Sequence, residues 1–351
     1  MFKKLFHSAL WGLAAAGVIL FAVPKLNNSS LFSADDIVSF NSAVRIASPA
    51  VVNVYNRSFS SASINDSDQL QVNNLGSGVI MTKDGYILTN KHVIQNADQI
   101  VVALQNGNIY EANLIGSDNL TDLAVLKIKA TDLSTIPQNK ERQVRVGDIA
   151  LAIGNPYNLG QSVSQGIISA VGRSAVGDSL GRQNFIQTDA SINRGNSGGA
   201  LINSAGELVG ISTLSIGKTA NEIAEGLNFA IPISIANDVL YKIIRDGRVI
   251  RGYFGVQSEI SSNSNGGIVI TGVTANSPAA KAGIQVGDVI LRLNKQDNLS
   301  IREMMQIISD TKPNTEVIIT ISRLGNVINL PVIIEELSLI HISVPTRPHS
   351  I

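Results

Sequence analysis

Three residues in this 351-residue chain have the types and spacing that nucleophilic catalysis requires. Ser197 lies in the glycine-rich stretch Gly-Asn-Ser-Gly-Gly (195–199), and His92 and Asp122 lie upstream of it. A serine hydroxyl is a weak nucleophile until a base takes its proton, and an imidazole base needs a carboxylate to fix its tautomer. We therefore expect Ser197 to be the nucleophile, His92 the general base and Asp122 the carboxylate that orients it.

The glycines around Ser197 have a second consequence. A backbone that turns sharply here can direct the N–H groups of Gly195 and Ser197, with Asn196 between them, toward one position. Such a pair of donors stabilises the oxyanion of an acyl-transfer intermediate. The segment therefore predicts an oxyanion hole as well as a nucleophile.

Each candidate catalytic residue could instead have a purely structural role. Ser197 could belong to a plain glycine-rich turn, and a lone histidine such as His92 is usually a core residue bonded to backbone. Asp118 and Asp122 are four residues apart in the sequence, and either carboxylate could face the imidazole. Asp118 lies in a turn-like stretch, whereas Asp122 opens an apolar run where it could be buried against a ring, so we select Asp122. Asp189 is expected to be a structural ligand of its own loop.

Composition excludes several classes of protein. Lys+Arg and Asp+Glu are both 27, so the net charge is zero, which argues against a nucleic-acid partner held by bulk charge. The chain has no cysteine, which excludes disulfides, thiolate metal sites and a cysteine nucleophile. The four histidines show no metal-ligand spacing, and nothing in the sequence calls for a cofactor or a metal. A hydrophobic content of 44% allows a substantial core, and the length allows two domains and a tail.

The N-terminus predicts a membrane anchor. Leu5 to Val23 is almost wholly apolar, and as a helix it would be roughly 28 Å long, close to the ~30 Å hydrocarbon core of a bilayer. Lys3 and Lys4 precede it, which favours a cytoplasmic N-terminus. The alternative is a cleaved signal peptide, but Ala-Val-Pro (22–24) is a poor cleavage site. We assign residues 1–24 to a stub and transmembrane helix, and the polar residues 25–38 to a tether.

The next part of the chain, residues 39–234, reads as an all-β domain. Short β-branched runs separated by turn residues indicate a barrel or sandwich, and they lie at 51–55, 78–81, 86–89, 100–104 and 123–128. A short helix is expected to begin within 41–46, and the polar stretch 58–74 reads as a long loop. Apolar residues at helical spacing in 235–245, ended by Asp-Gly, predict a helix within a connector at 235–251.

These residues resemble the HtrA family of serine proteases. The resemblance rests on motifs in family order and spacing: Thr-Asn-x-His-Val (89–93), Thr-Asp-Leu-Ala-Val-Leu-Lys (121–127), Gly-Asn-Pro (154–156), Gln-Thr-Asp-Ala-x-Ile-Asn (187–193) and Gly-Asn-Ser-Gly-Gly (195–199). It runs from about Ser39 to about Glu336, and Arg194 departs from the proline usual in the family. It implies two packed, six-stranded chymotrypsin-like barrels, and an oxyanion hole that can be misformed at rest.

Residues 252–336 resemble a PDZ domain, which is an α+β fold. A PDZ groove adds the C-terminal strand of its ligand to a sheet edge, and backbone N–H groups capture the terminal carboxylate. The resemblance places the carboxylate loop at Tyr253, Phe254, Gly255 and Val256, and it places Met304 on the helix that lines the groove. The alternative that Met304 is simply a core residue stays open.

The resemblance also implies specificity and regulatory residues. It places the S1 wall at Ile192 and the stretch Ser212 to Ile216, with Ile192, Ser212 and Leu214 as the pocket residues. No acidic residue lies at the expected pocket base, so we expect the substrate residue that enters it to be a small aliphatic one such as valine. It places Arg173 in a loop after 167–172 that reports PDZ occupancy. Tyr157 and Gln187 would be its relay partners beside the oxyanion loop, whereas the alternative for Arg173 is a solvated loop residue.

Within the family, the layout is most similar to the membrane-anchored, single-PDZ stress-sensor branch. That similarity implies a homotrimer assembled near Phe40, held in the bacterial inner membrane with its catalytic and PDZ domains in the periplasm. It implies that the PDZ domain binds C-termini of unfolded outer-membrane proteins and that the substrate is a membrane-spanning anti-sigma factor. Two alternatives are a constitutive periplasmic quality-control protease and chaperone, and a catalytically inert PDZ scaffold.

The tail from Leu337 to Ile351 matches nothing expected after a PDZ strand. It resembles translated sequencing-adapter read-through, as found in some gene models. The alternative is a disordered natural extension. Neither interpretation assigns it a function.

Overall fold

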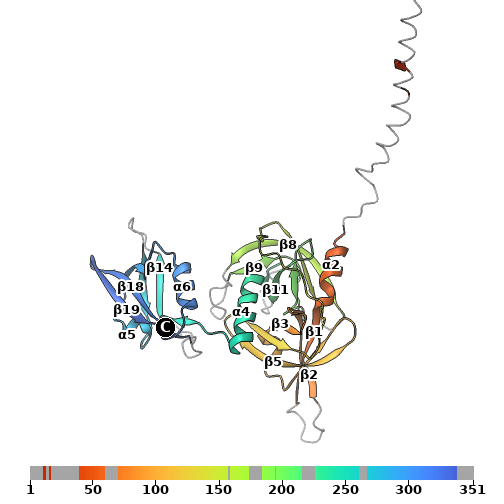
Figure 1. Ribbon diagram of the computed structural model, residues 1–351, viewed down its shortest axis with the longest axis horizontal. Coiled ribbons are helices and arrows are strands. Elements are labelled where there is room, and N and C mark those ends of the chain that lie inside the picture. Colours follow the sequence, from red (N-terminus) through yellow and green to blue (C-terminus); the bar gives the residue numbers. More distant parts are fainter. Residues whose placement is uncertain are drawn as a thin grey trace, which may run out of the picture. The chain divides into compact units, whose positions relative to one another are not determined.

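The computed structural model describes residues 11–12, 16, 39–59, 70–156, 159–173, 184–193, 195–215, 226–260 and 267–337, and Figure 1 shows their elements. The chain divides into two units, Met1–Ser42 and Ala43–Ile351. Within 1–38 only Trp11, Gly12 and Ala16 are described. The predicted anchor and tether therefore lie almost wholly outside the described residues, as does the tail beyond Leu337. Among the described residues, no helix has the length and apolar character needed to cross a membrane.

The first six strands close into a barrel. It follows helix α2 (Asn41–Ala47) and a turn of 3₁₀ helix, η1 (Ser48–Ala50), so the short helix expected here is confirmed. Alternate residues of the first strand point inward, with Val52 and Val54 fully buried, as the two-residue period of a strand requires. Neighbours in the barrel follow the order β1-β2-β3-β6-β5-β4. The strands are β1 (Val51–Phe59), β2 (Leu70–Ile80), β3 (Tyr86–Asn90), β4 (Gln99–Ala103), β5 (Ile109–Asp118) and β6 (Leu123–Lys127), with the short helix α3 (Lys91–Ile94) directly after β3.

Six further strands close into a second barrel, in the order β10-β11-β12-β9-β8-β7. Its core combines alanine with larger aliphatic side chains. These buried residues are Ala150, Ala152, Ile168, Ile186, Ala190, Ile192, Leu201, Val209 and Ala230. The strands are β7 (Ile149–Gly154), β8 (Ser162–Arg173), β9 (Phe185–Thr188), β10 (Ala200–Ile202), β11 (Leu208–Ser215) and β12 (Asn228–Pro232). The two six-stranded barrels expected from the resemblance are confirmed.

Helix α4 (Ile233–Asp246) follows the second barrel and packs on β5, β6, β11 and β12 (Figure 1). Its inward face carries Val239, Leu240 and Ile243, which agrees with the helical spacing read from the sequence. Gly247 ends the helix in a left-handed conformation, with φ of 73°, and its N–H donates to the Ile243 carbonyl. Glycine is favoured at this position because it has no Cβ to clash in that conformation. The predicted connector helix is therefore confirmed, with its N-terminus two residues earlier.

The C-terminal elements form the PDZ fold, in which one sheet has the order β14-β15-β16-β18-β19 with β17 paired to β16. Helix α6 begins with a capping box, because Ser300 and Glu303 exchange side-chain-to-backbone hydrogen bonds. A core that includes Phe254, Ile270 and Ile319 lies beneath these elements. They are β13 (Gly252–Tyr253), β14 (Val256–Ile260), β15 (Ile268–Val273), α5 (Pro278–Lys281), β16 (Val289–Leu293), β17 (Gln296–Asp297), α6 (Ile301–Asp310), β18 (Glu316–Arg323), β19 (Asn326–Ile333) and β20 (Glu335–Glu336).

The structure corrects two boundaries that the sequence predicted as loops. The polar stretch 58–74 was expected to be wholly loop, but Ser58 pairs with Gln71 and Phe59 with Leu70 in the β1–β2 ladder. Backbone hydrogen bonds carry this extension, and a bulge between Asn56 and Arg57 adjusts its register. Strand β8 likewise continues to Arg173, whose backbone pairs with Phe185, so Arg173 ends a strand instead of lying in a loop.

Candidate active site

The pairing of β3 with β6 brings His92 and Asp122 together. Asn90, the last residue of β3, lies opposite Leu123, the first residue of β6. His92 follows Asn90 on helix α3, and Asp122 precedes Leu123, so the two side chains meet at the same end of this strand pair. The His92 ring nitrogen Nδ1 lies 2.6 Å from Asp122 Oδ2, and the His92 backbone N–H donates to Asp122 Oδ1 at 3.0 Å. This contact fixes both the orientation and the tautomer of the imidazole.

Asp118 occupies a different environment from the one the sequence suggested. Its side chain is 7% exposed, and its carboxylate accepts two hydrogen bonds from the Arg251 guanidinium, at 2.6 and 2.8 Å, and two from Thr121. Burial alone would raise the pKa of this carboxyl, but the hydrogen bonds and charge of Arg251 outweigh burial and hold that pKa below its ordinary value. Asp122, the carboxylate selected from the sequence, is the one that meets the His92 ring, and its side chain is 19% exposed.

Two buried residues support the Asp122 carboxylate. The Asn90 amide Nδ2 donates to the Asp122 carbonyl and to Thr213 Oγ1, both at 3.1 Å. Thr213 Oγ1 in turn lies 3.3 Å from Asp122 Oδ2. Because the amide occupies the oxygen of the hydroxyl as an acceptor, the hydroxyl proton is left for the carboxylate. Sequence reasoning gave neither residue a role in supporting Asp122: Asn90 lies in the quoted Thr-Asn-x-His-Val motif, and Thr213 lies in the stretch assigned to the S1 wall.

Ser197 lies in the turn before β10, where its hydroxyl donates to the Thr213 carbonyl at 3.1 Å. Within the described residues, no hydrogen bond joins this hydroxyl to the His92 ring. Glycine is required at the two positions after Ser197 because backbone atoms of neighbouring strands lie too close for a side chain. A Cβ at Gly198 would lie 2.2 Å from the Ser77 carbonyl oxygen, and one at Gly199 would lie 2.3 Å from the Ile153 carbonyl oxygen. No other residue type could occupy these two positions without displacing the neighbouring strands.

Two hydrogen bonds fix the backbone of the predicted oxyanion hole, one at the Gly195 carbonyl and one at the Asn196 N–H. Gly195 has a φ of 103°, and its carbonyl accepts a hydrogen bond from Ser77 Oγ at 2.7 Å. The Asn196 N–H donates to the Asn193 carbonyl at 2.9 Å, which closes a tight turn. In the described part of the chain, the N–H groups of Gly195 and Ser197 have no acceptor. They are therefore the two donors of this turn that are not used within the described structure.

The structure places the predicted specificity and regulatory residues as follows. Ile192 and Ser212 are buried in the second barrel, and nothing is described of the Leu214 side chain beyond its position on β11. Gln187 lies on β9, whereas Tyr157 and the Arg173 side chain fall outside what is described. Those assignments stay predictions. Asp189 accepts a hydrogen bond from the Ile167 N–H at 2.7 Å, in agreement with its expected structural role.

The predicted peptide-binding loop lies between β13 and β14. Gly255 has a φ of 85°, and a Cβ there would lie 2.2 Å from the Ser277 Cβ. Strand β14 stands at one end of the described PDZ sheet, so it offers a sheet edge beside this loop. Met304 is 2% exposed and belongs to the PDZ core, while the adjacent Met305 is 47% exposed.

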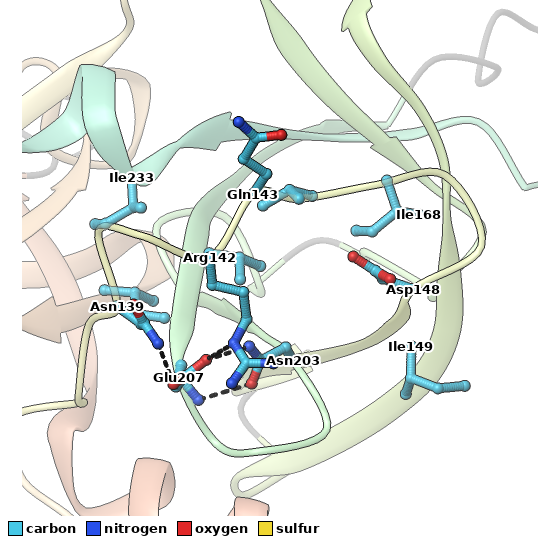
Figure 2. Close-up of a pocket in the computed structure, with 12 residues that line it drawn as sticks. Asn139, Arg142, Gln143, Asp148, Ile149, Ile168, Asn203, Glu207 and Ile233 are labelled. Atoms are coloured by element: carbon cyan, nitrogen blue, oxygen red, sulfur yellow. Dashed lines mark hydrogen bonds and ion pairs between the residues drawn. The ribbon is translucent and has the colours of Figure 1, made fainter.

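A cavity of about 40 Å³ lies in the second barrel, away from the catalytic residues (Figure 2). At its rim, Glu207 is ringed by donors, because Arg142 Nε, Asn203 Nδ2 and Asn139 Nδ2 lie 2.7, 2.7 and 3.3 Å from its carboxylate (Figure 2). These contacts join the segment between the two barrels to the β10–β11 turn. The cavity holds space for only a few waters, and its two lining carboxylates, Glu207 and Asp148, are already bonded, so it is a structural feature. Among the described residues, no cluster of His, Cys, Asp and Glu could hold a metal ion.

Comparison with known proteins agrees with this architecture. A family model described as a trypsin-like peptidase domain matches residues 76–211, and one described as a PDZ domain matches residues 252–334. The serine endoprotease DegS of Haemophilus influenzae is 83% identical over 336 residues, which cover 96% of this chain and 99% of that protein.

Solved structures are similar as well. The crystal structure of the serine endoprotease from Yersinia pestis has 52% sequence identity and a TM-score of 0.72, covering 87% of this chain and 100% of that one. The HtrA-type protease AlgW, solved with a decapeptide, has 40% identity and a TM-score of 0.75, covering 86% of this chain and 99% of that one.

Removal of the Ser197 hydroxyl tests the catalytic assignment. We expect Ser197→Ala to abolish proteolysis and to leave the fold intact, because the substitution deletes one atom. We expect His92→Ala to be about as severe, since the members of a triad act as a unit. Casein cleavage and circular dichroism measure the two effects. Residual cleavage by Ser197→Ala within about tenfold of wild type would mean that the nucleophile is elsewhere.

The buried Asp118–Arg251 pair predicts a pH-dependent contribution to stability. Because the folded-state pKa of Asp118 is lowered, the pair stabilises the fold above the unfolded carboxyl pKa of about 3.9, and this contribution is lost as pH falls through the folded-state value. We expect Asp118→Asn to lower the free energy of unfolding by about 3 kcal/mol at pH 7, since it leaves the buried Arg251 charge unneutralised.

Urea unfolding of wild type and Asp118→Asn at pH 7 and at pH 3 measures this effect. The difference between the two proteins should shrink at the lower pH. The exposed carboxylate Asp297 offers a matched control, and Asp297→Asn should change stability by less than about 0.5 kcal/mol at either pH. An Asp118→Asn effect that did not depend on pH would contradict the role assigned to the ion pair.

Proposed function

Since the chain belongs to the HtrA family of serine proteases and is itself a serine endoprotease, we propose that it is a membrane-anchored stress sensor of that family. In this proposal, the PDZ domain binds the exposed C-termini of unfolded outer-membrane proteins. The protease domain then cleaves a membrane-spanning anti-sigma factor and so starts the envelope stress response. The proteolytic chemistry is supported above all by the 2.6 Å contact between His92 Nδ1 and Asp122 Oδ2.

The reaction follows from the arrangement of these groups. The Ser197 oxygen attacks the peptide carbonyl while His92 takes the hydroxyl proton, and Asp122 stabilises the imidazolium that forms. The oxyanion of the tetrahedral intermediate accepts hydrogen bonds from the N–H groups of Gly195 and Ser197. His92 then gives its proton to the leaving amine, and an acyl-enzyme remains. Water attacks this ester by the same route in reverse and frees Ser197.

The Ser197 hydroxyl must leave the Thr213 carbonyl and turn to the imidazole before it can attack. This requirement is consistent with a protease whose site is completed by a second event. In the proposal, that event is peptide binding at the PDZ domain, relayed by Arg173, Tyr157 and Gln187 to the oxyanion loop. A peptide can shift such an equilibrium only through different affinities for the two states.

Several features support the sensing part of the proposal. The edge strand β14 follows the Gly255 turn directly, which is the arrangement that captures a C-terminal strand and its carboxylate. The relative AlgW was solved with a decapeptide, and the relative from Haemophilus influenzae is a DegS. A PDZ domain model matches residues 252–334, which include this turn and this edge strand.

The proposed location is the bacterial inner membrane, crossed once, with the catalytic and PDZ domains in the periplasm. It is supported by the apolar run from Leu5 to Val23 after Lys3 and Lys4. The proposed assembly is a homotrimer with contacts near Phe40. No nucleic acid or cofactor takes part.

Peptide titration tests the sensor function. We expect casein cleavage by wild type to rise with the concentration of a peptide that ends in an aromatic residue. The same peptide with an amidated C-terminus should have no effect, because its carboxylate is lost. Arg173→Ala should bind the peptide nearly as well, measured by fluorescence anisotropy, yet respond less. Deletion of residues 252–336 should leave basal cleavage equal or higher and independent of peptide.

A wild-type cleavage rate that is high without peptide and flat across the titration would refute the sensor function. It would favour a constitutive quality-control protease. A chain that neither cleaves casein nor reacts with a fluorophosphonate at Ser197 would instead be an inert PDZ scaffold.

Alkaline carbonate washing of membranes tests the anchor. We expect the full-length chain to stay in the membrane fraction, because a transmembrane helix is not released by high pH. N-terminal sequencing of the mature protein provides the second measurement. A mature N-terminus between Val23 and Ala34 would show that the segment is a cleaved signal peptide.

A further inference from the structure

The structure assigns to Ser77 the role of the positioning residue that holds the oxyanion turn in shape. Ser77 lies on β2 of the first barrel and is fully buried. It contacts both ends of the nucleophile turn, since its hydroxyl donates to the Gly195 carbonyl at 2.7 Å and its backbone N–H donates to the Ser197 carbonyl at 2.8 Å. The inference rests on Ser197 being the nucleophile.

The direction of the hydroxyl bond is determined by a third contact. The backbone N–H of Asn155, in the Gly-Asn-Pro motif, donates to Ser77 Oγ at 3.0 Å. Since Ser77 Oγ already accepts the hydrogen bond from Asn155, its single proton is available to a different group, and it is donated to the Gly195 carbonyl. The Ser77 carbonyl also accepts a bond from Thr89 Oγ1 at 2.7 Å. Every polar group of this buried serine is therefore satisfied, and none is free to exchange partners.

These bonds constrain the peptide group between Gly195 and Asn196. Its carbonyl is bonded to Ser77, and its N–H is bonded to the Asn193 carbonyl. This peptide lies between the two peptides that carry the oxyanion donors, the N–H groups of Gly195 and Ser197. Holding the central peptide restricts ψ of Gly195 and φ of Asn196, the torsions that set the angle between the two donor peptides, so the Ser77 hydroxyl helps to fix the directions of both donors relative to each other. Ser77 touches neither substrate nor the reacting atoms, and its effect on catalysis passes through the turn.

The residues beside Ser77 allow this contact to form. A Cβ at Gly76 would lie 2.6 Å from the Val93 methyl carbons and 3.0 Å from the Ser197 carbonyl oxygen. A Cβ at Gly78 would lie 2.8 Å from Ile87 Cγ2. Gly76 thus lets β2 approach the turn of the other barrel closely enough for the Ser77 hydroxyl to reach it, and Gly78 lets β2 pack closely on its own barrel.

Ser77→Ala tests the assignment, with the full-length chain, casein as substrate and a fluorophosphonate as the probe of Ser197. We expect kcat and the labelling rate to fall about 10- to 100-fold, because a misdirected oxyanion donor weakens transition-state binding. KM should change less than about twofold, since the oxyanion forms only in the transition state. The pH dependence of kcat/KM should keep its midpoint, because the His92–Asp122 pair is not touched.

Two further variants separate positioning from general stability. Ser77→Thr keeps the hydroxyl and should recover most of the activity. Ser58→Ala removes another buried hydroxyl from the same β1–β2 pair, one that bonds to Asn73 and not to the oxyanion turn, and it should label at the wild-type rate. If Ser77→Ala does not fold, Ser77→Cys takes its place, since a thiol is a weak donor of similar shape, and it should label more slowly than Ser77→Thr.

Labelling of Ser77→Ala within about twofold of wild type, or an equal loss in Ser58→Ala, would overturn the inference. A shifted pH midpoint or a large rise in KM in Ser77→Ala would also overturn it, because the damage would then reach beyond the oxyanion turn. If wild type itself does not label at Ser197, the catalytic assignment fails together with the inference. A labelled wild type with an unaffected Ser77→Ala defeats the inference alone.

Discussion

The close backbone contact between strand β2 and the nucleophile turn is the constraint on which the active site depends. His92 and Asp122 belong to one barrel and Ser197 to the other, so the chemistry requires the two barrels to meet within hydrogen-bonding distance. They meet where the Ser77 N–H donates to the Ser197 carbonyl, and a side chain at Gly76 or Gly198 would push them apart. Both glycines are needed for the approach between barrels, and Gly198 also belongs to the turn around the nucleophile.

The active site also requires Asp122 to keep a strained backbone conformation, which several hydrogen bonds hold in place. Asp122 has a φ of 55°, and a left-handed conformation costs a residue with a side chain about 1–3 kcal/mol. Its carbonyl accepts bonds from the Lys91 N–H and the Asn90 amide, and its carboxylate accepts the His92 N–H. These contacts offset the strain and leave Oδ2 facing the imidazole. A catalytic carboxylate fixed in this way needs little reorganisation when the imidazolium forms.

Much of this arrangement could be predicted from the sequence because its signals are local. Glycines around Ser197, β-branched runs and the Asp-Gly that ends α4 each mark a structure within a few residues. Asn90 and Thr213 are far apart in sequence, and their meeting depends on how the barrels pack, so no local pattern reveals their role. Met304 and Met305 show another limit. They are neighbours on one helix, and only the helical phase decides that Met304 enters the core while Met305 is exposed.

The choice between Asp118 and Asp122 shows why burial alone does not identify a catalytic carboxylate. The sequence argument selected Asp122 because it opens an apolar run, and in the structure the carboxylate that was not selected, Asp118, is the more buried of the two. The Asp118 carboxylate accepts its hydrogen bonds from Arg251 and Thr121, whereas the His92 ring and backbone N–H meet Asp122. The charge of Asp118 is also balanced by the guanidinium, so the pair adds little to the field at His92. Asp122 is left as the carboxylate whose charge acts on the imidazole, and it has that role because its neighbours donate hydrogen bonds without bringing a cation.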